Sequence, residues 1–572
     1  MTSVLRWCGV LILLVLPTLP KAKAQATFED GTRASGLDSF VLTAGSPEMK
    51  KYLYEAMGGG VCLLDYDGDG YLDIYFVNGG RVEPFVTGKP TGVSNALFHN
   101  EHNGMFREVT ASAGVGGNGK WGMGCSVVDY DNDGRPDLYV TNFGGNILYH
   151  NLGNGKFENV TAKAGVADGG WATGSAWADY DGDGYPDLFV ADYISLAPEK
   201  FPPPGSAEFS GMGGGSGCVY RGMPVMCGPL GLPPGENHLY HNNGDGTFTE
   251  VTQKAGINPK ERAYSLGVNW CDLDNSGRPD IFVANDSTPS YLYENLGGES
   301  FKEVGLLSGV AVNQNGTPQA AMGVTCGDYL NSGRPALYVT AFSEDVNTLF
   351  RNDGNLNFLD VTMSTGLGPP TLPMVGWGTF FFDFDNDGWL DLFVADGHVY
   401  PEMNSVPGPV RYREPNLLFR NDQHGHFDVM PAAALPALPK VSRGACFADL
   451  NNDGAEDIVV SNVDASPTLL WNHSGTGNHF LTLTLVGTKS NRDAIGATVR
   501  LRVGKEWQSR QRHAGESYLS SCDPRIHFGL GHAEKADEVE VLWPDGQKTV
   551  LHDVRADLFM TVTEGQGKQS QR

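Results

Sequence analysis

Short runs of apolar residues alternate with acidic, glycine-rich turns over most of the chain. Runs such as 138–140 and 392–394 have the length of single strands, and each follows directly on a turn rich in Asp, Asn and Gly. Further along each unit, as in 147–165 and 238–256, an Asn-x-Gly-x-Gly step separates two alternating apolar stretches, which is typical of a hairpin. Each unit therefore predicts a strand, an acidic turn, a second strand and a hairpin.

The acidic turn recurs seven times as variants of Asp-x-Asp-x-Asp-Gly-x-x-Asp, and we number these acidic loops one to seven along the chain. Their first positions are 65, 129, 179, 272, 328, 383 and 449. A unit of roughly 50 to 60 residues and four strands is the size of one blade of a β-propeller. The longer gap between loops three and four holds an insertion over 193–236 that is rich in Pro and Gly.

The seventh unit lacks its last strand, and the segment 27–36 near the N-terminus resembles the missing piece. A first segment that completes the last blade would close the ring and remove a free sheet edge. The sequence therefore predicts an all-β fold, with a seven-bladed β-propeller over 25–472. Two separate repeat domains, divided at the 193–236 insertion, are the alternative.

The spacing of the carboxylates indicates a site for a hard divalent cation, which binds six to eight oxygen atoms at short range. Asp side chains at loop positions 1, 3, 5 and 9 can point inward with the backbone carbonyl of position 7, and Gly at position 6 permits the tight turn. Position 12 is Phe or Val where an EF-hand needs Glu, so these loops are not EF-hands. Turn formation alone, which also favours Asp, Asn and Gly, is the competing explanation.

We expect Ca²⁺ rather than Mg²⁺, with about five to six ions per chain, because Mg²⁺ prefers few protein ligands and several waters. Loops four and seven replace one Asp each and should bind more weakly, while loop five keeps only Asp328 and Ser332 and is expected to be empty. The predicted ligands are Asp65, Asp67, Asp69, Tyr71, Asp73, Asp129, Asp131, Asp133, Arg135, Asp137, Asp179, Asp181, Asp183, Tyr185, Asp187, Asp272, Asp274, Ser276, Arg278, Asp280, Asp383, Asp385, Asp387, Trp389, Asp391, Asp449, Asn451, Asp453, Ala455 and Asp457.

The N-terminus reads as a signal peptide over 1–24, with Arg6 before an apolar stretch and Ala22-Lys23-Ala24 as the cleavage motif. An uncleaved membrane anchor is the alternative, but the apolar stretch is short for a bilayer. No other segment is long and apolar enough to cross a membrane, so we expect a secreted protein, or a periplasmic one in a bacterium. The formal net charge of −27 argues against a nucleic-acid partner.

Eight cysteines remain after removal of the signal peptide, in a compartment that permits disulfides. Cys218 and Cys227 flank a short stretch of the insertion, and we predict that they form a disulfide. The other six lie near apolar strand positions, where free buried cysteines are the simpler expectation.

The acidic repeats resemble the FG-GAP/VCBS family, which includes the calcium loops of integrin α-chain propellers. From residue 473 a different pattern begins, with blocks at 491–497, 515–521, 527–531 and 539–546. These blocks look like the ASPIC/UnbV domain of cartilage-acidic-protein-like (CRTAC) proteins, so 473–565 is expected to be a small β-rich domain and 566–572 a disordered tail. We expect the chain to depart from some animal members by lacking the EGF-like module that they carry after this domain.

Two classes of function remain open at this stage. A calcium-stabilised scaffold that binds or adheres to an extracellular protein or glycan, without catalysis, is favoured because no nucleophile elbow, metalloprotease helix or phosphate loop stands out. The alternative is an exported hydrolase or lyase, with a site in the propeller channel or at the 193–236 insertion. His398 follows a predicted strand, but a lone His without a spaced partner more often makes a hydrogen bond than catalyses a reaction.

Overall fold

The computed structural model describes residues 28–202, 218–257, 262–436, 438–474 and 477–566, together with the backbone of 570–571. The expected signal peptide over 1–24 and the middle of the insertion therefore lie outside the described residues. Among the described residues, no helix has the length and apolar character needed to cross a membrane.

The repeats fold into four-stranded antiparallel sheets, of which the described residues contain seven, one for each acidic loop. Sheets one to three contain β2 (Val61–Leu64), β3 (Asp73–Phe76), β4 (Ala96–Asn100), β5 (Phe106–Glu108); β6 (Trp121–Val128), β7 (Asp137–Phe143), β8 (Ile147–Asn151), β9 (Phe157–Asn159); and β10 (Ala172–Ala178), β11 (Asp187–Asp192), β14 (His238–Asn242), β15 (Phe248–Glu250). Sheets four to seven contain β16 (Ser265–Cys271), β17 (Asp280–Asn285), β18 (Tyr291–Gly297), β19 (Ser300–Glu303); β20 (Ala321–Gly327), β21 (Ala336–Ala341), β22 (Thr348–Asn352), β23 (Phe358–Asp360); β24 (Gly376–Phe382), β25 (Asp391–Asp396), β26 (Leu417–Asn421), β27 (Phe427–Val429); and β28 (Ser442–Ala448), β29 (Asp457–Asn462), β30 (Thr468–Asn472) with β1 (Phe28–Asp30).

The first two strands of each sheet are almost entirely buried, and the acidic loop joins them. These first strands carry glycines where neighbouring backbones approach closely. A Cβ on Gly323 would lie 2.0 Å from the carbonyl oxygen of Trp377 in the next sheet, and one on Gly60 would lie 1.9 Å from that of Leu519. Side chains are therefore excluded at these positions, which allows the sheets to converge.

Hydrogen bonds link consecutive sheets and return from sheet seven to sheet one. An Asn on the third strand of each sheet donates its amide to the position-2 carbonyl of the preceding acidic loop. Asn151 thus reaches Tyr66 at 2.9 Å, and Asn100 in sheet one reaches Leu450 in loop seven at 2.8 Å. The N-terminal strand β1 pairs antiparallel with β30 and completes sheet seven, as the sequence predicts.

Short helical turns follow the fourth strand in several sheets, a feature that the strand-only prediction missed. They are α2 (Thr110–Ala113), α3 (Thr161–Ala164) and α4 (Gly305–Ser308), each ending at a left-handed Gly, while α1 (Val82–Val86) and α5 (Gly368–Thr371) lie in longer connections. Single 3-10 turns occupy Leu37–Ser39, Leu53–Glu55, Gly117–Gly119, Pro198–Lys200, Pro401–Ser405 and Ala432–Ala434. Of the insertion, β12 (Val219–Tyr220) and β13 (Met223–Pro224) form a hairpin.

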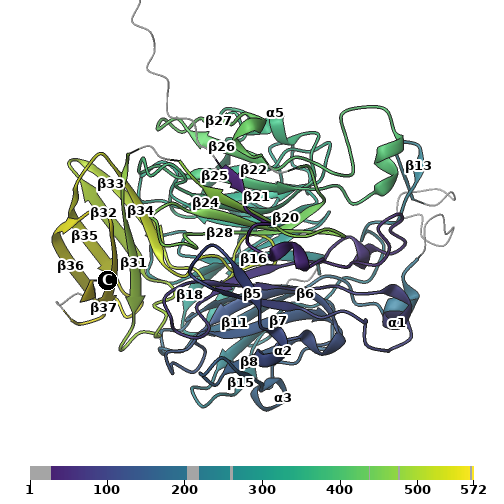
Figure 1. The fold of residues 1–572 in the computed structure, drawn as a ribbon, viewed down its shortest axis with the longest axis horizontal. Coiled ribbons are helices and arrows are strands. Elements are labelled where there is room, and N and C mark those ends of the chain that lie inside the picture. Colours follow the sequence, from purple (N-terminus) through teal and green to yellow (C-terminus); the bar gives the residue numbers. More distant parts are fainter. Residues whose placement is uncertain are drawn as a thin grey trace, which may run out of the picture.

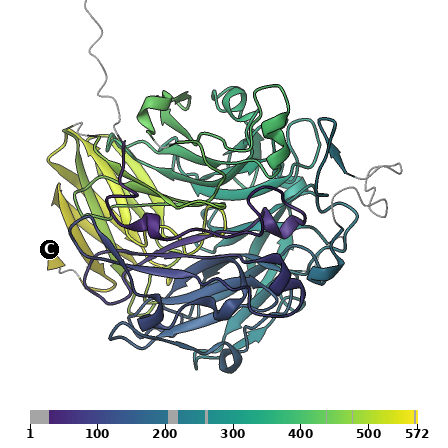
Figure 2. The same cartoon turned by 45° about the vertical axis from the view of Figure 1, so that its right-hand side comes forward.

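The C-terminal region forms two further four-stranded sheets around its own apolar core. One contains β31 (His479–Val486), β34 (Ile526–Gly531), β37 (Leu558–Thr563) and β38 (Ser570–Gln571), and the other β32 (Thr498–Val503), β33 (Glu506–Gln511), β35 (Lys535–Leu542) and β36 (Lys548–Arg555). The expectation of a disordered tail is wrong for Ser570–Gln571, which pair with β37. Figures 1 and 2 show these sheets in yellow-green on one side of the repeat region, and Figure 1 shows α1 and β13 on the opposite side.

A loop of the C-terminal region, residues 512–522, enters the centre of the repeat region, and we call it the plug segment. Its backbone and side chains form hydrogen bonds with the first strand of all seven repeat sheets. The partners are Val61 and Leu63 in sheet one, Cys125 in sheet two, Trp177 in sheet three, Trp270 in sheet four, Val324 in sheet five, Thr379 in sheet six and Ala445 in sheet seven. The plug segment thus lies among the first strands of the seven repeat sheets and links them.

The cysteines correct one expectation. Cys218 and Cys227 form a disulfide, the pair expected from the sequence. Four of the six cysteines expected to be free are also paired: Cys62 with Cys125, and Cys271 with Cys326. Each of these bonds joins the first strands of two consecutive sheets, which lie side by side although they are far apart in sequence. Cys446 and Cys522 are free and buried.

Candidate metal centre

Each acidic loop is organised by its first Asp, which accepts backbone hydrogen bonds from the turn that follows. In loop one, Asp65 Oδ1 accepts from the N–H groups of Gly68 and Asp69 at 2.8 and 3.0 Å, and Oδ2 accepts from that of Gly70 at 2.9 Å. The position-6 glycine has a φ between +79° and +92° in all seven loops, a left-handed conformation that favours glycine. The first Asp and this glycine therefore set the shape of the turn.

The Asp at position 9 opens the second strand of the sheet and is buried. Asp73 Oδ2 accepts from the N–H of Tyr66 at 3.2 Å, and Oδ1 accepts from that of Asn100 at 2.8 Å. Burial is the main cause that raises the pKa of Asp73 to about 9 and those of Asp187 and Asp280 to about 8. Ionised carboxylates at these positions are thus unfavourable unless a cation compensates them.

Positions 3 and 5 bring two more carboxylates to the solvent side of the loop. The side chains of Asp67 and Asp69 are 27% and 26% exposed, so an ion can approach from this side. The position-5 carboxylate also accepts from the N–H of position 7, as Asp69 does from Tyr71 at 2.9 Å. The same bond is made by Arg135, Tyr185, Trp389 and Ala455, and Arg278 makes its counterpart with Ser276.

The oxygen-rich donor set fits Ca²⁺. In loop two, Asp131 Oδ1 is buried and has no hydrogen-bond partner among the described residues, and the same holds for Asp391 Oδ2 in loop six. A buried oxygen without a partner is costly, and a bound cation would remove that cost. Pairs of the predicted carboxylates lie close to the neighbouring His in loops one, two and three: Asp67 and Asp69, Asp131 and Asp137, and Asp181 and Asp187.

Loop five retains the turn but not the carboxylates. Asp328 accepts from the N–H groups of Ser332 and Gly333 at 2.9 and 2.6 Å, so the Asp at position 1 stabilises the turn as it does in the other loops. Leu330 and Ala336 stand where other loops have Asp.

The predicted ligand set omits a strand residue that lies beside the carboxylates of several acidic loops. His99, His150 and His241 occupy one repeat position, and each lies 3.2 Å from the position-9 carboxylate and within 3.5 Å of the position-3 carboxylate. In sheet six the equivalent residue is Arg420, which pairs with Asp385 at 2.5 Å and Asp387 at 3.2 Å. The recurrence of His directly before the third-strand Asn is the signal in the sequence that could have found this contact.

The C-terminal region lies on the face of the repeat region that carries the acidic loops. At loop two, the N–H of Arg492 donates to Asn132 Oδ1 at 2.7 Å. At loop four, the N–H of Asp272 donates to the side-chain oxygen of Gln511 at 3.0 Å. At loop six, the side chains of His527 and Asn386 share a hydrogen bond of 2.7 Å. Arg525 donates to the carbonyl of Asp449 in loop seven at 2.7 Å. The geometry of several acidic loops is therefore coupled to the seating of the C-terminal region.

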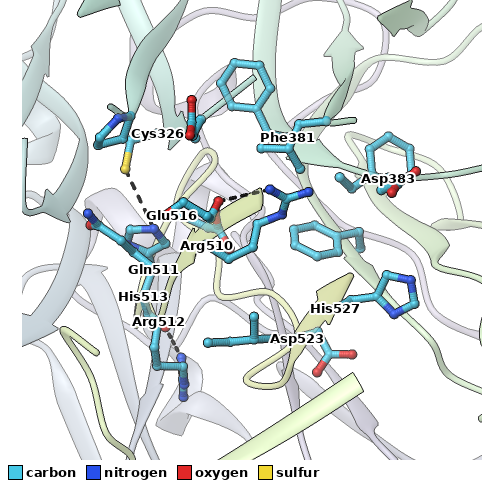
Figure 3. Close-up of a pocket in the computed structure, with 18 of the residues that line it drawn as sticks. Cys326, Phe381, Asp383, Arg510, Gln511, Arg512, His513, Glu516, Asp523 and His527 are labelled. Carbon is cyan, nitrogen blue, oxygen red and sulfur yellow. Dashed lines mark hydrogen bonds between the residues drawn. The ribbon is translucent and has the colours of Figure 1, made fainter. Parts of the chain in front are cut away.

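A cavity of about 90 Å³ lies at this junction (Figure 3). Arg510 extends into it from the C-terminal region, near Asp383, while Glu516 and Asp523 lie on other walls. Burial raises the pKa of Glu516 to about 7. The cavity has room for a few water molecules and holds opposite charges, which is typical of a hydrated polar interface.

The alternative enzyme sites receive no support from the described residues. The plug segment occupies the centre of the repeat region, and in the insertion Arg221 pairs with Glu344 at 2.8 Å. His398 is fully buried among Tyr220, Phe342 and Tyr400, and burial lowers its pKa to about 3, which keeps the imidazole neutral.

Comparison with known families matches both parts of the chain. The repeat region matches the model for the FG-GAP-like repeat over 65–140, 129–190, 230–283, 272–339 and 328–394. Residues 487–569 match the model described as ASPIC and UnbV.

Curated relatives are named Cartilage acidic protein 1. The protein of Mus musculus is 27% identical over 325 residues, which cover 55% of this chain and 47% of the relative. That of Homo sapiens is 24% identical over 527 residues, which cover 88% of this chain and 62% of the relative. The chain thus matches less than two thirds of the length of either relative.

Solved structures resemble the chain only distantly. A lectin of Agrocybe aegerita, described as specifically recognising non-reducing terminal N-acetylglucosamine, is 17% identical over 65% of this chain and 80% of its own, with a TM-score of 0.37. A TM-score this low supports no argument about ligands.

Proposed function

Because the chain belongs to the FG-GAP-repeat proteins that carry an ASPIC and UnbV domain, the cartilage-acidic-protein-like family, we propose that it is a secreted, seven-bladed, calcium-loaded propeller that acts as a binding scaffold. The seven repeat sheets are the blades, and the acidic loops lie together on one face. The C-terminal region, which we assign to 473–565, seals that face.

The observation that carries the calcium proposal is the presence of carboxylates that the turn does not need. Loop five forms the turn with Asp at position 1 alone. Loops one, two, three and six add three further carboxylates to the same turn, and carboxylates placed this closely repel one another without a cation. Their role is therefore to bind an ion, and Ca²⁺ is the ion that such an all-oxygen set prefers.

We assign the full-strength sites to loops one, two, three and six, weaker sites to loops four and seven, and none to loop five. Arg420 places a guanidinium on the loop-six carboxylates, so loop six should bind more weakly than loop three, whose carboxylates form no ion pair with Arg or Lys among the described residues. The proposed total remains about five to six ions per chain.

The proposed role is recognition of an extracellular protein or glycan rather than catalysis. The channel, where an enzyme of this shape would hold its site, is filled by the plug segment, which itself bonds to all seven blades. Calcium would then keep the blades and the C-terminal region rigid, so that a surface is presented in one conformation.

The experiment is a metal count on the mature protein by plasma mass spectrometry, with calcium titration by calorimetry after removal of bound ions. Five to six calcium ions, with two or more affinity classes, are expected. A protein that stays folded and binds no calcium would contradict the proposal and leave the loops as turns. Binding to arrayed glycans and extracellular proteins, with and without calcium, then tests the scaffold role.

A further inference from the structure

The far end of sheet three carries a second cluster of potential metal ligands, away from the acidic loops. The strand β11 begins with Asp187 in loop three and ends with Asp192, so the two residues are separated by roughly 16 Å of extended chain. Asp192 is 4% exposed. Beside it lie Asp168, from the loop before β10, and His238, the first residue of β14.

We propose that Asp168, Asp192 and His238 form a site for a divalent transition metal of the zinc type. One atom from each residue lies within 4.8 Å of the other two, and His238 Nε2 is 3.7 Å from Asp168 Oδ1. In a tetrahedral zinc site with bonds near 2.1 Å, ligand atoms are about 3.4 Å apart. The cluster therefore needs only a small contraction to coordinate such an ion.

One oxygen atom of each carboxylate lacks a partner that a structural role would provide, while Asp168 Oδ1 accepts from the N–H of Gly170 at 3.1 Å. Asp168 Oδ2 and Asp192 Oδ1 are buried and have no hydrogen-bond partner among the described residues. Neither carboxylate forms an ion pair with Lys or Arg in the described part of the chain, and His238 is the neighbouring basic group. Two carboxylates this close repel each other unless a cation or a shared proton lies between them.

The repeat shows that a carboxylate is not needed at this strand end. The equivalent residue is Asn in sheets one, two, four and seven: Asn78, Asn142, Asn285 and Asn462. Asn285 donates its amide to the carbonyl of Pro289 at 2.7 Å, and Asn462 donates to that of Ser466 at 3.0 Å. A carboxylate cannot make this bond, so Asp192 replaces a structural donor with a ligand atom.

The balance of donors distinguishes this site from the acidic loops: His238 lies with two carboxylates here, whereas the loop histidines His99, His150 and His241 stand beside loops that carry four. Calcium prefers a shell of oxygens, whereas imidazole nitrogen suits zinc and its neighbours among the first-row metals. Two carboxylates and one His leave a coordination position for water, as in open zinc sites. Access is available, because the His238 side chain is 24% exposed and Gly169 beside Asp168 is also exposed.

The test is titration of the full mature protein with Zn²⁺ under saturating Ca²⁺, which occupies the acidic loops. The wild type should bind one Zn²⁺ that Asp192→Asn does not, with at least a tenfold rise in Kd for the variant. Asp192→Asn restores the residue of four other sheets and should fold normally. Asp396→Asn, at the same repeat position in sheet six where no His is present, is the matched control and should leave zinc binding unchanged.

A second readout separates coordination from nonspecific charge. Co²⁺ bound at the site should give visible absorption bands that His238→Gln abolishes, while calcium content and thermal stability stay unchanged. Absence of a zinc ion in the calcium-loaded wild type, or equal zinc binding by wild type and Asp192→Asn, would overturn the proposal. In that case the two carboxylates share a proton.

Discussion

Loops two and five have nearly the same backbone and very different chemistry. In both, the first Asp accepts from the N–H groups of positions 5 and 6, at 2.9 and 2.7 Å in loop two and at 2.9 and 2.6 Å in loop five. The residue at position 4 has a φ of +59° in one loop and +52° in the other. Loop two then adds Asp131, Asp133 and Asp137, where loop five has Leu330, Ser332 and Ala336.

The difference separates two roles that the repeat pattern combines. The first Asp and the glycine are requirements of the turn, so they persist in loop five. The remaining carboxylates raise the electrostatic cost of the ion-free fold, and burial raises the pKa of Asp137 to about 7. Residues that are costly without an ion and unnecessary for the turn are best explained by the ion.

Removal of calcium should have the largest effect. A ligand present at 100 times its Kd stabilises the folded state by about 2.7 kcal/mol per site, and several such sites together rival the whole stability of a typical domain. We expect EDTA to lower the melting temperature sharply and Ca²⁺, but not Mg²⁺, to restore it. If the scanning calorimetry trace is the same with and without EDTA, calcium does not stabilise the protein, and loop two then differs from loop five in sequence but not in ion binding.

Asp137→Asn should remove one ion and about 2–3 kcal/mol of the calcium-dependent stability. Because the side chain keeps its size, the loss should appear mainly as a smaller difference between melts in Ca²⁺ and in EDTA. Ser332→Ala in loop five is the control and should leave the ion count unchanged. If both variants bind as many ions as the wild type, Asp137 is not a ligand.

Rebuilding loop five should add an ion. Leu330→Asp combined with Ala336→Asp restores positions 3 and 9, so calorimetry should show one additional calcium per chain. In EDTA the variant should be less stable than the wild type, because Ala336 is only 1% exposed and a carboxylate there is buried. A folded variant with no additional ion would show that the neighbouring Arg510, or the loop itself, prevents binding.

The smallest effect concerns a bond that both loops share. Asn132 donates its amide to the carbonyl of Gly184 at 2.9 Å, and Asn331 donates to that of Gly388 at 3.0 Å. Gly occupies this position in loops one and three, so Asn→Gly avoids backbone strain. Asn331→Gly should cost about 1 kcal/mol, and Asn132→Gly about 2, because it also loses the bond from Arg492. Urea denaturation in saturating calcium measures the free energy of unfolding of both variants. If both lose the same amount, the bond between Arg492 and Asn132 does not contribute to stability.

The sequence predicted what depends on local spacing. The four strands per unit, the turn at each acidic loop and the replacement strand near the N-terminus all follow from patterns within a few dozen residues. The Cys218–Cys227 disulfide was predictable for the same reason, because the two cysteines are separated by 9 positions.

What depends on neighbouring sheets could not be predicted from local pattern. Cys62 and Cys125 are 63 residues apart, and only the packing of two first strands brings them together. The local sequence of the plug segment predicts only a loop of a small β domain, because its composition does not indicate which strands it contacts. His150 belongs to the third strand of its sheet, so its position beside Asp137 depends on the register of two strands.

The pairing of β1 with β30 has a consequence for biosynthesis. The first strand leaves the ribosome more than 400 residues before its partner, Thr468–Asn472, is made. At 5–20 residues per second this delay is roughly twenty seconds to a minute and a half. During that interval the nascent chain exposes an unpaired edge, which invites wrong pairing between chains. Protection by a chaperone until translation ends would therefore matter more for this protein than for one whose strands pair in the order in which they are made.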